Sequence, residues 1–423
     1  MTRIPTTSER EAEARIEALL AQRTNYERKR PDRPRFSLEP TRRLLDSLGC
    51  LKPCPTVVQI GGSKGKGTTA AYLEAMLSRV GRRVGVYSSP HLVSLTERIR
   101  IDGAPIPVQV LEGLVEEVAR VAAPEVSFFE LMTAVAGLAF QRAGLDIGIF
   151  EVGLGGRLDS TTAVEADLSI LTRVELEHTE VLGPTVHRIA QEKAHVFRRG
   201  AFGLTAARGP ARVLVASHAR RVGCTLQVRG LEFDASGIPS SRLRLRSGTR
   251  RHDLRVPGAP PHESEAIALA FAATERLAPG EFDDPVLDRP GGSGRCELRS
   301  LDGDPLILDV AHTGDSARAL ADFCRSSLGG RAATLLYASA TGKRWQAVLS
   351  PLLDLVDEVL VTELPGTASE DPVTIRDWLG ERDVGAGAVP DLAEALAQLR
   401  ARSRPRIVTG SFVLVGEALR AFA

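Results

Sequence analysis

The sequence is poor in aromatic residues and carries almost no net charge. Phe, Trp and Tyr make up 4% of its 423 residues, and 54 Lys and Arg against 53 Asp and Glu leave a net charge of +1. Such a balance excludes a protein whose whole surface is directed to nucleic acid or to an anionic membrane. Any phosphate group must therefore be bound by a local site.

Cysteines and long apolar runs are scarce as well. The five cysteines are scattered, with no second pair at zinc-finger spacing, which favours free thiols in a reducing compartment. No apolar run approaches the length that spans a bilayer, and the first twenty residues lack the apolar core of a signal peptide. We therefore expect a cytoplasmic protein with neither a membrane nor a nucleic acid as partner.

Short apolar segments alternate with helical segments, which is typical of buried parallel strands in an α/β fold. A loose stretch rich in Pro, Gly and Asp, Ala278–Gly294, interrupts this alternation. We expect a P-loop-type parallel-sheet ATPase domain at residues 1–288, followed by a smaller Rossmann-like α/β domain at 289–423. Within the first domain, Gln227–Val256 alternates leucine with Arg or Asp and predicts an antiparallel hairpin at a sheet edge.

A glycine-rich loop, GGSKGKGTT at residues 61–69, follows a predicted strand at 56–60 and precedes a predicted helix at 68–80. Its glycines let backbone N–H groups approach an anion, and the helix N-terminus adds partial positive charge. Lys66 supplies a full charge for the β- and γ-phosphates, and the Thr68 hydroxyl can hold Mg²⁺. A turn without a ligand is the alternative, but strand, loop and helix together favour a nucleotide. The expected ATP-binding residues of the loop are Gly62, Ser63, Lys64, Gly65, Lys66, Gly67 and Thr68.

Eight further motifs occur in a fixed order after this loop. They are SSPHLVSLTERIRIDG (88–103), FFELMTA (128–134), EVGLGGRLDSTT (151–162), EHTEVLG (177–183), EKA (192–194), GRCE (294–297), LDVAH (308–312) and TGSFVLVG (409–416). With the phosphate loop, they resemble the folylpolyglutamate synthase/dihydrofolate synthase branch of the Mur ligase superfamily, over roughly residues 36–416. The resemblance implies a monomeric ligase that joins L-glutamate to folate or dihydropteroate with ATP, through an acyl phosphate.

The resemblance also implies two magnesium sites and leaves room for a monovalent cation. The implied metal ligands are Thr68, Ser89, Glu151, His178 and Lys193. The lysine would bind metal only after carbamylation, which converts its ammonium group into a carboxylate. Carbamylation needs a neutral amine, hence a lysine of lowered pKa. From the residues alone, His178 would be a loop histidine, since magnesium prefers oxygen, and Lys193 would lie on a solvated helix face.

Further roles follow from the same resemblance. Lys66, Lys193 and His312 are the implied catalytic residues, and Arg295 and Asp309 of the second domain are implied to reach the nucleotide when the domains close. Phe128 and Phe129 are implied to lie near the pterin ring, where aromatic side chains can stack. Packing in the core is the alternative for both phenylalanines.

Three segments depart from the family pattern. The family's D-G-A-H-N reads DVAHT at 309–313, and H-Q-x-x-N reads HESEA at 262–266. The family's asparagine meets the nucleotide, whereas Ala266 has no hydrogen-bonding side chain. The loop SATGKRW at 339–345 also lacks an Asp-Lys-Asp spelling. The sequence therefore leaves two other readings open: a related ligase with a different carboxylate acceptor, and a paralogue that binds nucleotide and pterin without turnover.

Overall fold

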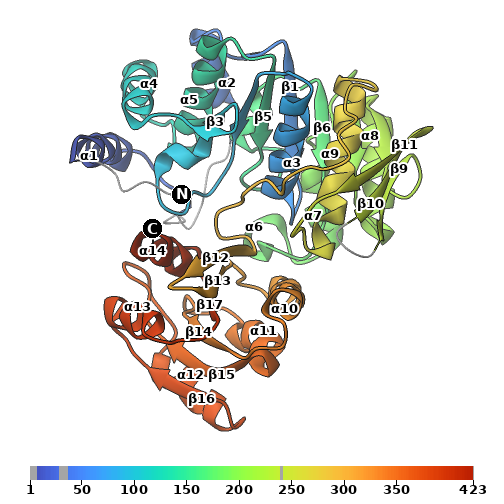
Figure 1. Cartoon of the computed structure of the whole chain (residues 1–423). Coiled ribbons are helices and arrows are strands. Elements are labelled where there is room, and N and C mark those ends of the chain that lie inside the picture. Colours follow the sequence, from blue (N-terminus) through green and yellow to red (C-terminus); the bar gives the residue numbers. More distant parts are fainter. Residues whose placement is uncertain (1–6, 28–36, 239–241, 423) are drawn as a thin grey trace. The chain divides into compact units, whose positions relative to one another are not determined.

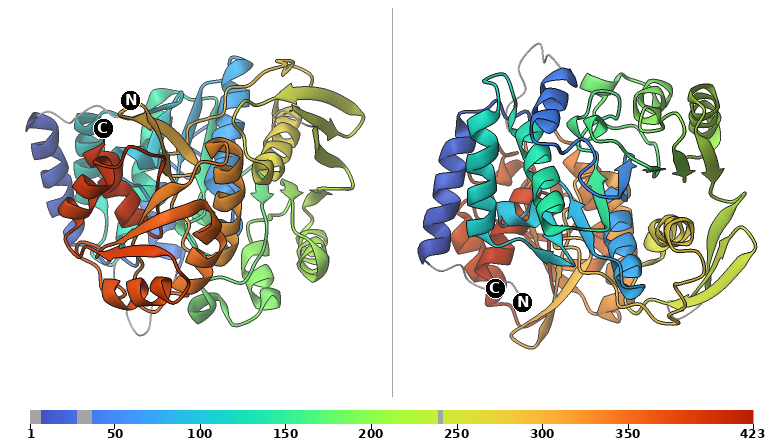
Figure 2. Two further views of the ribbon diagram at one scale, coloured as in Figure 1. Left: turned by 60° about the horizontal axis from the view of Figure 1, so that its bottom comes forward. Right: turned by 90° about the horizontal axis from the view of Figure 1, so that it is seen from above.

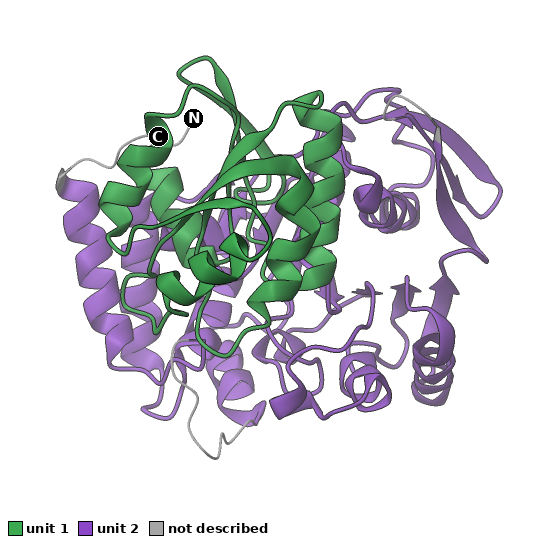
Figure 3. Cartoon of the chain, turned by 90° about the horizontal axis from the view of Figure 1, so that it is seen from below, with its two compact units in different colours: residues 1–4, 291–423 green, residues 5–290 purple. Residues whose placement is uncertain are grey.

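The computed structural model describes residues 7–27, 37–238 and 242–422 (Figure 1). The chain divides into two compact units, residues 5–290 and 291–423 (Figure 3). The sequence placed a boundary at 288/289, within the same loose stretch. Among the described residues, none of the helices is both long and apolar enough to cross a membrane.

The N-terminal unit is built on an eight-stranded sheet of order β4-β3-β2-β5-β1-β6-β7-β8. Six of these strands run parallel, and only β3 and β4 are antiparallel to their neighbours. The carboxyl ends of the parallel strands therefore lie at one edge, where α/β sheets collect ligands. The strands are β1 (Thr56–Gly61), β2 (Val84–Tyr87), β3 (Ile99–Ile101), β4 (Ala104–Pro105), β5 (Ile147–Glu151), β6 (Leu168–Leu171), β7 (Phe202–Thr205) and β8 (Thr225–Val228).

Helices cover both faces of this sheet, because its strands are apolar on both sides. On β1, Val58 and Ile60 belong to the core cluster that holds α3 and α9, whereas Val57 belongs to the cluster that holds α2 and α5. Figures 1 and 2 show α3 and α9 side by side, and the two helices are in contact. The helices are α1 (Thr7–Ala21), α2 (Glu39–Ser47), α3 (Lys66–Arg79), α4 (Val108–Val121), α5 (Phe128–Ala143), α6 (Thr179–Leu182), α7 (Val186–Ala194), α8 (Gly209–Val222) and α9 (Ser264–Leu277), with 3₁₀ turns η1 (Leu95–Arg98), η2 (Ser160–Ala163) and η3 (Pro261–Glu263).

The predicted antiparallel hairpin is present, and it belongs to a sheet of its own. Strands β10 (Arg242–Ser247) and β11 (Arg250–Arg255) do pair antiparallel, but with β9 (Phe233–Ile238) they form a separate three-stranded sheet. The reason is the alternation itself: Leu243 and Leu245 pack into the α9 core, so the hairpin lies against a helix and does not extend the parallel sheet.

The C-terminal unit holds a six-stranded sheet of order β12-β13-β17-β14-β15-β16, in which only β12 is antiparallel to its neighbour. This is the Rossmann-like α/β arrangement that the sequence predicts. The elements are β12 (Glu297–Leu301), β13 (Asp304–Leu308), α10 (Gly314–Leu328), β14 (Ala333–Tyr337), α11 (Trp345–Leu349), η4 (Ser350–Leu355), β15 (Val356–Val361), α12 (Pro372–Gly380), β16 (Gly385–Ala388), α13 (Leu392–Arg400), β17 (Arg406–Thr409) and α14 (Phe412–Ala421).

Candidate functional site

The glycine-rich loop joins β1 to α3 at the carboxyl edge of the large sheet. Gly65 adopts a left-handed conformation (φ +83°) directly before the helix. At Gly62 (φ +138°) a Cβ would lie 1.8 Å from Oγ1 of Thr172, so only glycine fits. The same Thr172 hydroxyl donates to the Lys64 carbonyl over 2.7 Å and so ties the loop to the end of β6. The loop is therefore a rigid cradle at the helix N-terminus.

Helix α3 begins at Lys66, two residues before the predicted start at Thr68. The left-handed Gly65 turns the chain early, so Gly67 and Thr68 lie in the first helical turn, where backbone N–H groups have no intrahelical acceptor. Nζ of Lys66 donates to the Gly62 carbonyl over 3.1 Å. The lysine thus curls back over the loop, as a phosphate-binding lysine would.

Lys193 meets the same carbonyl from another direction. Its side chain is only 2% exposed, and its Nζ lies 3.0 Å from the Gly62 oxygen and 2.8 Å from Oε1 of Glu177. Burial, together with the charge of Lys66, lowers the pKa of Lys193 to about 8. The sequence alone favoured a solvated helix face, which the burial contradicts; a lowered pKa is what carbamylation requires.

Glu177 is a residue that the sequence analysis missed as a member of the site. Burial alone would raise the pKa of Glu177, but the charges of Lys193 and Lys66 outweigh it and hold that pKa low. Glu177 precedes the predicted ligand His178, and this position was the available signal. The Glu177 carboxylate therefore offsets the positive charges of the Lys193 and Lys66 ammonium groups.

Glu151 and Ser89 lie at the same edge, on the other side of the loop. Glu151 ends β5, is 3% exposed and stands in register with Ile60 of β1. Ser89 follows β2, which is the next strand beyond β5. Parallel pairing therefore brings the predicted ligands Ser89 and Glu151 to adjacent strand ends, at the same edge as Thr68 in the first turn of α3.

Asp159, also missed from the sequence, shapes the loop after Glu151. Its oxygens accept hydrogen bonds from the backbone N–H groups of Gly153, Leu154 and Thr161 at 2.9–3.0 Å, and from the Thr161 hydroxyl at 2.6 Å. Burial raises its pKa despite these bonds. By accepting several backbone hydrogen bonds, the Asp159 carboxylate fixes the conformation of this loop.

His178 is the least enclosed of the predicted metal ligands. Its side chain is 43% exposed, its backbone is left-handed (φ +45°), and its Nδ1 lies 3.9 Å from Oε1 of Glu180. Within the described part of the chain, no three His, Cys, Asp or Glu side chains form a group that could hold a metal.

Phe128 and Phe129 open α5, whose N-terminus carries a capping box between Ser127 and Glu130. Phe128 is buried beneath the guanidinium of Arg98 at 5.0 Å, which favours a packing role for this ring. Phe129 is half-buried and lies against Gly153, where a Cβ would come within 2.7 Å of the ring. Phe129 is therefore the ring that stays partly accessible beside the Glu151 loop.

The second-domain residues occupy one loop cluster of the C-terminal unit. Asp309 is buried, and its two oxygens accept from the backbone N–H groups of Cys296 at 2.7 Å and Ala311 at 2.8 Å. Burial raises the pKa of Asp309 to about 6. Arg295 is half-buried beside this carboxylate, and His312 is exposed, with its Nδ1 2.9 Å from the Val310 carbonyl. Asp309 thus joins the segments that carry the other two residues.

The departures from the family pattern have local partners. Glu263 is buried, accepts from the Tyr72 hydroxyl at 2.6 Å and pairs with Arg289 at 2.5 Å. Thr313 caps α10 through a reciprocal bond with Ser316. Ala266 is buried in the core of α9. These substitutions therefore fit their surroundings as structural residues.

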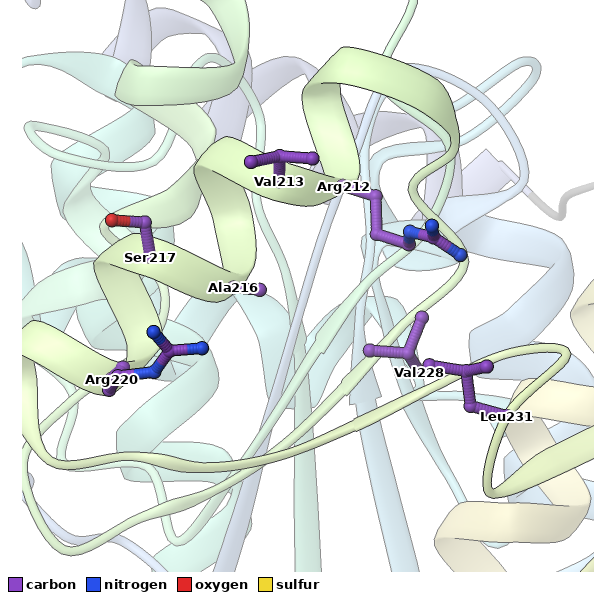
Figure 4. A pocket seen from close by; sticks show the side chains of 7 residues that line it. All are labelled: Arg212, Val213, Ala216, Ser217, Arg220, Val228 and Leu231. Carbon is purple, nitrogen blue, oxygen red and sulfur yellow. The ribbon is translucent and has the colours of Figure 1, made fainter.

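A cavity of about 440 Å³ lies elsewhere in the N-terminal unit, between α8 and the segment after β8 (Figure 4). Val213, Val228 and Leu231 line it, with Arg212 and Arg220 alongside. None of the predicted site residues borders this cavity.

Comparisons with known proteins agree with the motifs. A family model described as the C-terminal domain of dihydrofolate synthetase matches residues 300–421. The chain is 30% identical to the dihydrofolate synthase/folylpolyglutamate synthase of Escherichia coli, over 88% of each chain. It is 32% identical, over 92% of its length, to a probable bifunctional folylpolyglutamate synthase/dihydropteroate synthase of Haloferax volcanii, of which it spans only 49%.

Solved structures show the same likeness across both units. E. coli FolC in complex with DHPP and ADP matches with a TM-score of 0.80 and 28% identity, over 96% of this chain and 97% of that one. A bifunctional folylpolyglutamate synthase/dihydrofolate synthase with Mn, AMPPNP and L-glutamate bound matches with a TM-score of 0.79 and 31% identity, over 92% and 95%.

Proposed function

The chain belongs to the dihydrofolate synthase/folylpolyglutamate synthase family, and we propose from this premise that it is an ATP-dependent ligase that adds L-glutamate to a folate-type carboxylate. The acceptor is dihydropteroate, a tetrahydrofolate, or both. The relatives whose structures hold DHPP, ADP, AMPPNP, Mn and L-glutamate support this set of substrates.

The observation that carries the proposal is the meeting of two lysines at one carbonyl oxygen. Lys66 and Lys193 both donate to Gly62, at 3.1 and 3.0 Å, at the N-terminus of α3. The Lys66 ammonium and the helix N-terminus form an anion-binding point suited to the terminal phosphates of a nucleotide, and the buried Lys193 at the same carbonyl is the residue we assign to carbamylation. Phosphoryl transfer needs such charge neutralisation and positioning more than covalent help.

The reaction then proceeds in two transfers. An oxygen of the acceptor carboxylate attacks the γ-phosphorus of ATP, a P–O bond forms, and ADP leaves. The amine of glutamate attacks the acyl carbon, the amide bond forms, and inorganic phosphate leaves with the loss of the amine proton. Lys66 holds the phosphoryl oxygens during the first transfer, and the rigid loop keeps them in line.

The residues present fit magnesium. Thr68 of α3 and Ser89 and Glu151 at adjacent strand ends offer hard oxygen donors, and Glu151 is a buried carboxylate beside the phosphate loop. We assign a first ion to these three residues, and a second to His178 and a carbamylated Lys193. The bound ions supply charge neutralisation on the phosphates.

Carbamylation of Lys193 would couple to metal binding. The ammonium first loses one proton. The neutral amine then attacks CO₂, an N–C bond forms as one C–O double bond opens, and a second proton is released, so a cation becomes an anion. This anion would face Glu177, which now lies 2.8 Å from Nζ. Two adjacent carboxylates repel each other unless a cation lies between them, so the modified lysine and the divalent ion stabilise one another.

Phe129 and the C-terminal unit complete the assignment. The partly exposed Phe129 ring is proposed to stack on the pterin, with Phe128 packed behind it. Arg295 and His312 are proposed to act on the nucleotide and the reacting groups. Asp309 is proposed to work through the loops it joins, since both its oxygens accept backbone N–H groups.

The test is release of ADP by the full chain with ATP, Mg²⁺ and L-glutamate, given dihydropteroate or tetrahydrofolate separately. We expect turnover with at least one acceptor. Absence of turnover with both would reject the proposal, and turnover with another carboxylic acid would favour the related ligase that the altered second-domain motifs leave open. A cytoplasmic location and a monomeric state remain predictions; light scattering on the purified chain checks the latter.

A further inference from the structure

The cavity between α8 and the turn that follows β8 combines apolar walls with two cationic side chains. Its volume of about 440 Å³ lies within the range of clefts that hold small molecules in proteins. Figure 4 shows Val228 and Leu231 across the cavity from the residues of α8 that line it, among them Arg212, Val213 and Arg220. These residues lie outside the motifs that identify the family, and the proposed ligase chemistry uses none of them.

Helix α8 supplies the cations and part of the apolar wall. Arg212 and Arg220 both border the cavity and lie eight residues apart, which is about 12 Å along the helix axis. The whole helix contains three arginines and no Asp or Glu. Its opposite face, with Val215 and Ala219, is buried in the core beside α7. The cavity therefore lies on the face of α8 that the core does not use.

The opposite wall is held in place by hydrogen bonds. The Leu231 N–H donates to the Val228 carbonyl over 3.1 Å, and the Leu231 carbonyl accepts from Arg246 of β10 over 2.8 Å. The Glu232 carboxylate accepts from the Val228 N–H over 2.7 Å. These bonds fix the turn from both sides, so the shape of the cavity is built into the fold.

Two exposed apolar side chains from different elements line this cavity. Val213 of α8 is 65% exposed and Leu231 of the turn is 58% exposed, whereas Val228 behind them is buried. A single exposed apolar side chain is ordinary, but several around one cavity form an apolar surface that a ligand can cover.

Arginines closer to the phosphate loop already have an anionic partner. Arg173, Arg208 and Arg229 follow β6, β7 and β8, and each lies 2.9 Å from an oxygen of Glu265. We call these four residues the Glu265 cluster. The Glu265 side chain, in the first turn of α9, is only 9% exposed. The positive charges of this cluster are therefore offset by a buried carboxylate.

Arg212 and Arg220 have no such counterion. Within residues 7–27, 37–238 and 242–422, no Asp or Glu side chain pairs with either guanidinium group. The third arginine of α8, Arg221, lies 2.9 Å from Nδ1 of His218 and does not border the cavity. Each guanidinium offers five N–H donors, so the cavity carries unpaired positive charge beside its apolar walls.

We propose that this cavity binds an amphipathic organic anion, a molecule with an aliphatic or aromatic body and a carboxylate or phosphate group. The body lies on Val213, Val228 and Leu231, and the anionic group pairs with Arg212 or Arg220. A planar guanidinium matches both kinds of oxyanion. The small volume favours a small molecule, and this site is additional to the ligase site proposed above.

The experiment is calorimetric titration of the full chain with hexanoate, octanoate, hexyl phosphate and octyl phosphate, below the concentrations at which they form micelles. Mg-AMPPNP is present in a parallel titration to block the phosphate loop. We expect saturable binding that Mg-AMPPNP does not abolish and that strengthens by about two- to fourfold for each added CH₂. Acetate, inorganic phosphate and octanol each carry only one of the two parts and should bind at least about tenfold more weakly than the octyl anions. The series that binds more tightly identifies the anionic group.

Substitutions locate the site. Replacing both Arg212 and Arg220 by Ala should weaken the octyl anions by about fivefold or more and leave octanol unchanged. Leu231→Ser should weaken the octyl anions and octanol alike, by about fivefold. Arg221→Ala is the matched control, since it removes the same charge from the same helix away from the cavity; its affinities should equal those of the wild type.

Two results would overturn the inference. One is the absence of saturable binding of both octyl anions, or equal affinities in the wild type, the double arginine variant and Leu231→Ser. The other is a dimer in light scattering that Leu231→Ser dissociates, which would place a second copy of the chain in the cavity. Binding does not depend on turnover, so an inactive protein with the expected affinities would reject the proposed ligase reaction and leave this site standing.

Discussion

The surroundings of Gly62 and the Glu265 cluster lie at one edge of the same sheet, yet they handle charge in opposite ways. Around Gly62 the side chain of Lys193 is 2% exposed, whereas at Glu265 the side chain of Arg208 is 63% exposed. Burial, together with the charge of Lys66, lowers the pKa of Lys193, whereas the charges of Lys193 and Lys66 hold the pKa of Glu177 low against its burial. At Glu265 it is the anion that is buried, and it orders cations that face outward.

The difference shows that burial decides what a charge can do. A desolvated charge acts strongly on its neighbours and on its own protonation, so it suits chemistry. An exposed charge contributes little binding energy but can still select a ligand by the geometry of its donors. The predictions below test this division, beginning with the buried side.

Lys66→Ala should lower kcat/KM for ATP by at least about 100-fold, the scale on which a preorganised charge acts. Steady-state ADP release measures it. Lys52→Ala, which removes an exposed lysine paired with Asp167, is the control and should leave the rate near that of the wild type. Equal rates for the two variants would contradict the claim that Lys66 contributes more to catalysis than an exposed lysine does.

Asp159→Ala should lower the free energy of unfolding by about 2 kcal/mol, because it leaves three backbone N–H groups without their acceptor. Urea denaturation gives the value. Asp159→Asn should lose less, since an amide oxygen still accepts and a neutral group avoids the desolvation that raises the pKa of Asp159. An alanine variant as stable as the wild type would show that the hydrogen bonds of Asp159 do not stabilise the loop after Glu151.

Carbamylation of Lys193 should become faster as the pH rises. Its pKa is lowered to about 8, so below that pH the protonated amine dominates and the reactive neutral fraction falls roughly tenfold per pH unit. Activity regained on adding bicarbonate to CO₂-depleted enzyme, followed at several pH values, measures this rate. Lys193→Arg cannot form a carbamate at neutral pH and should show no bicarbonate response; the same response in both proteins would contradict the assignment.

Tyr72→Phe should have the smallest effect, about 1 kcal/mol of unfolding free energy, since it removes one hydrogen bond to the buried Glu263. Because this bond joins α3 to the turn η3 directly before α9, it connects the two regions compared above. We expect a slightly weaker nucleotide affinity together with the lower stability. A stability loss without any change in affinity would show that the two regions act independently.

Local patterns were enough to predict the parallel strands, the phosphate loop and most helices. The start of α3 was misplaced by two residues. The helix begins after the left-handed Gly65, and the sequence does not show which of the loop's glycines adopts that conformation. The third strand, β9, was missed because FDASGI alternates too weakly to stand out beside β10 and β11.

The missed residues share a different cause. Glu177, Asp159 and Glu265 contact partners that are distant in sequence or backbone N–H groups. Neither kind of contact produces a recognisable pattern of residue types in the sequence. Lys193 and Gly62 are 131 residues apart, yet they share a hydrogen bond. Glu263 stands where the family pattern has glutamine, and the structure adds what the sequence could not, namely its contacts with Tyr72 and Arg289.

The close approach of Gly62 to Thr172 also bears on how this loop can change over generations. A methyl group at position 62 collides with the Thr172 hydroxyl, and shortening Thr172 to make room removes the bond that holds Lys64. Neither single replacement is neutral, and the backbone of Gly62 (φ +138°) disfavours a side chain there whatever residue stands at 172. Comparison of distant homologues should therefore find positions 62 and 172 inherited as a unit.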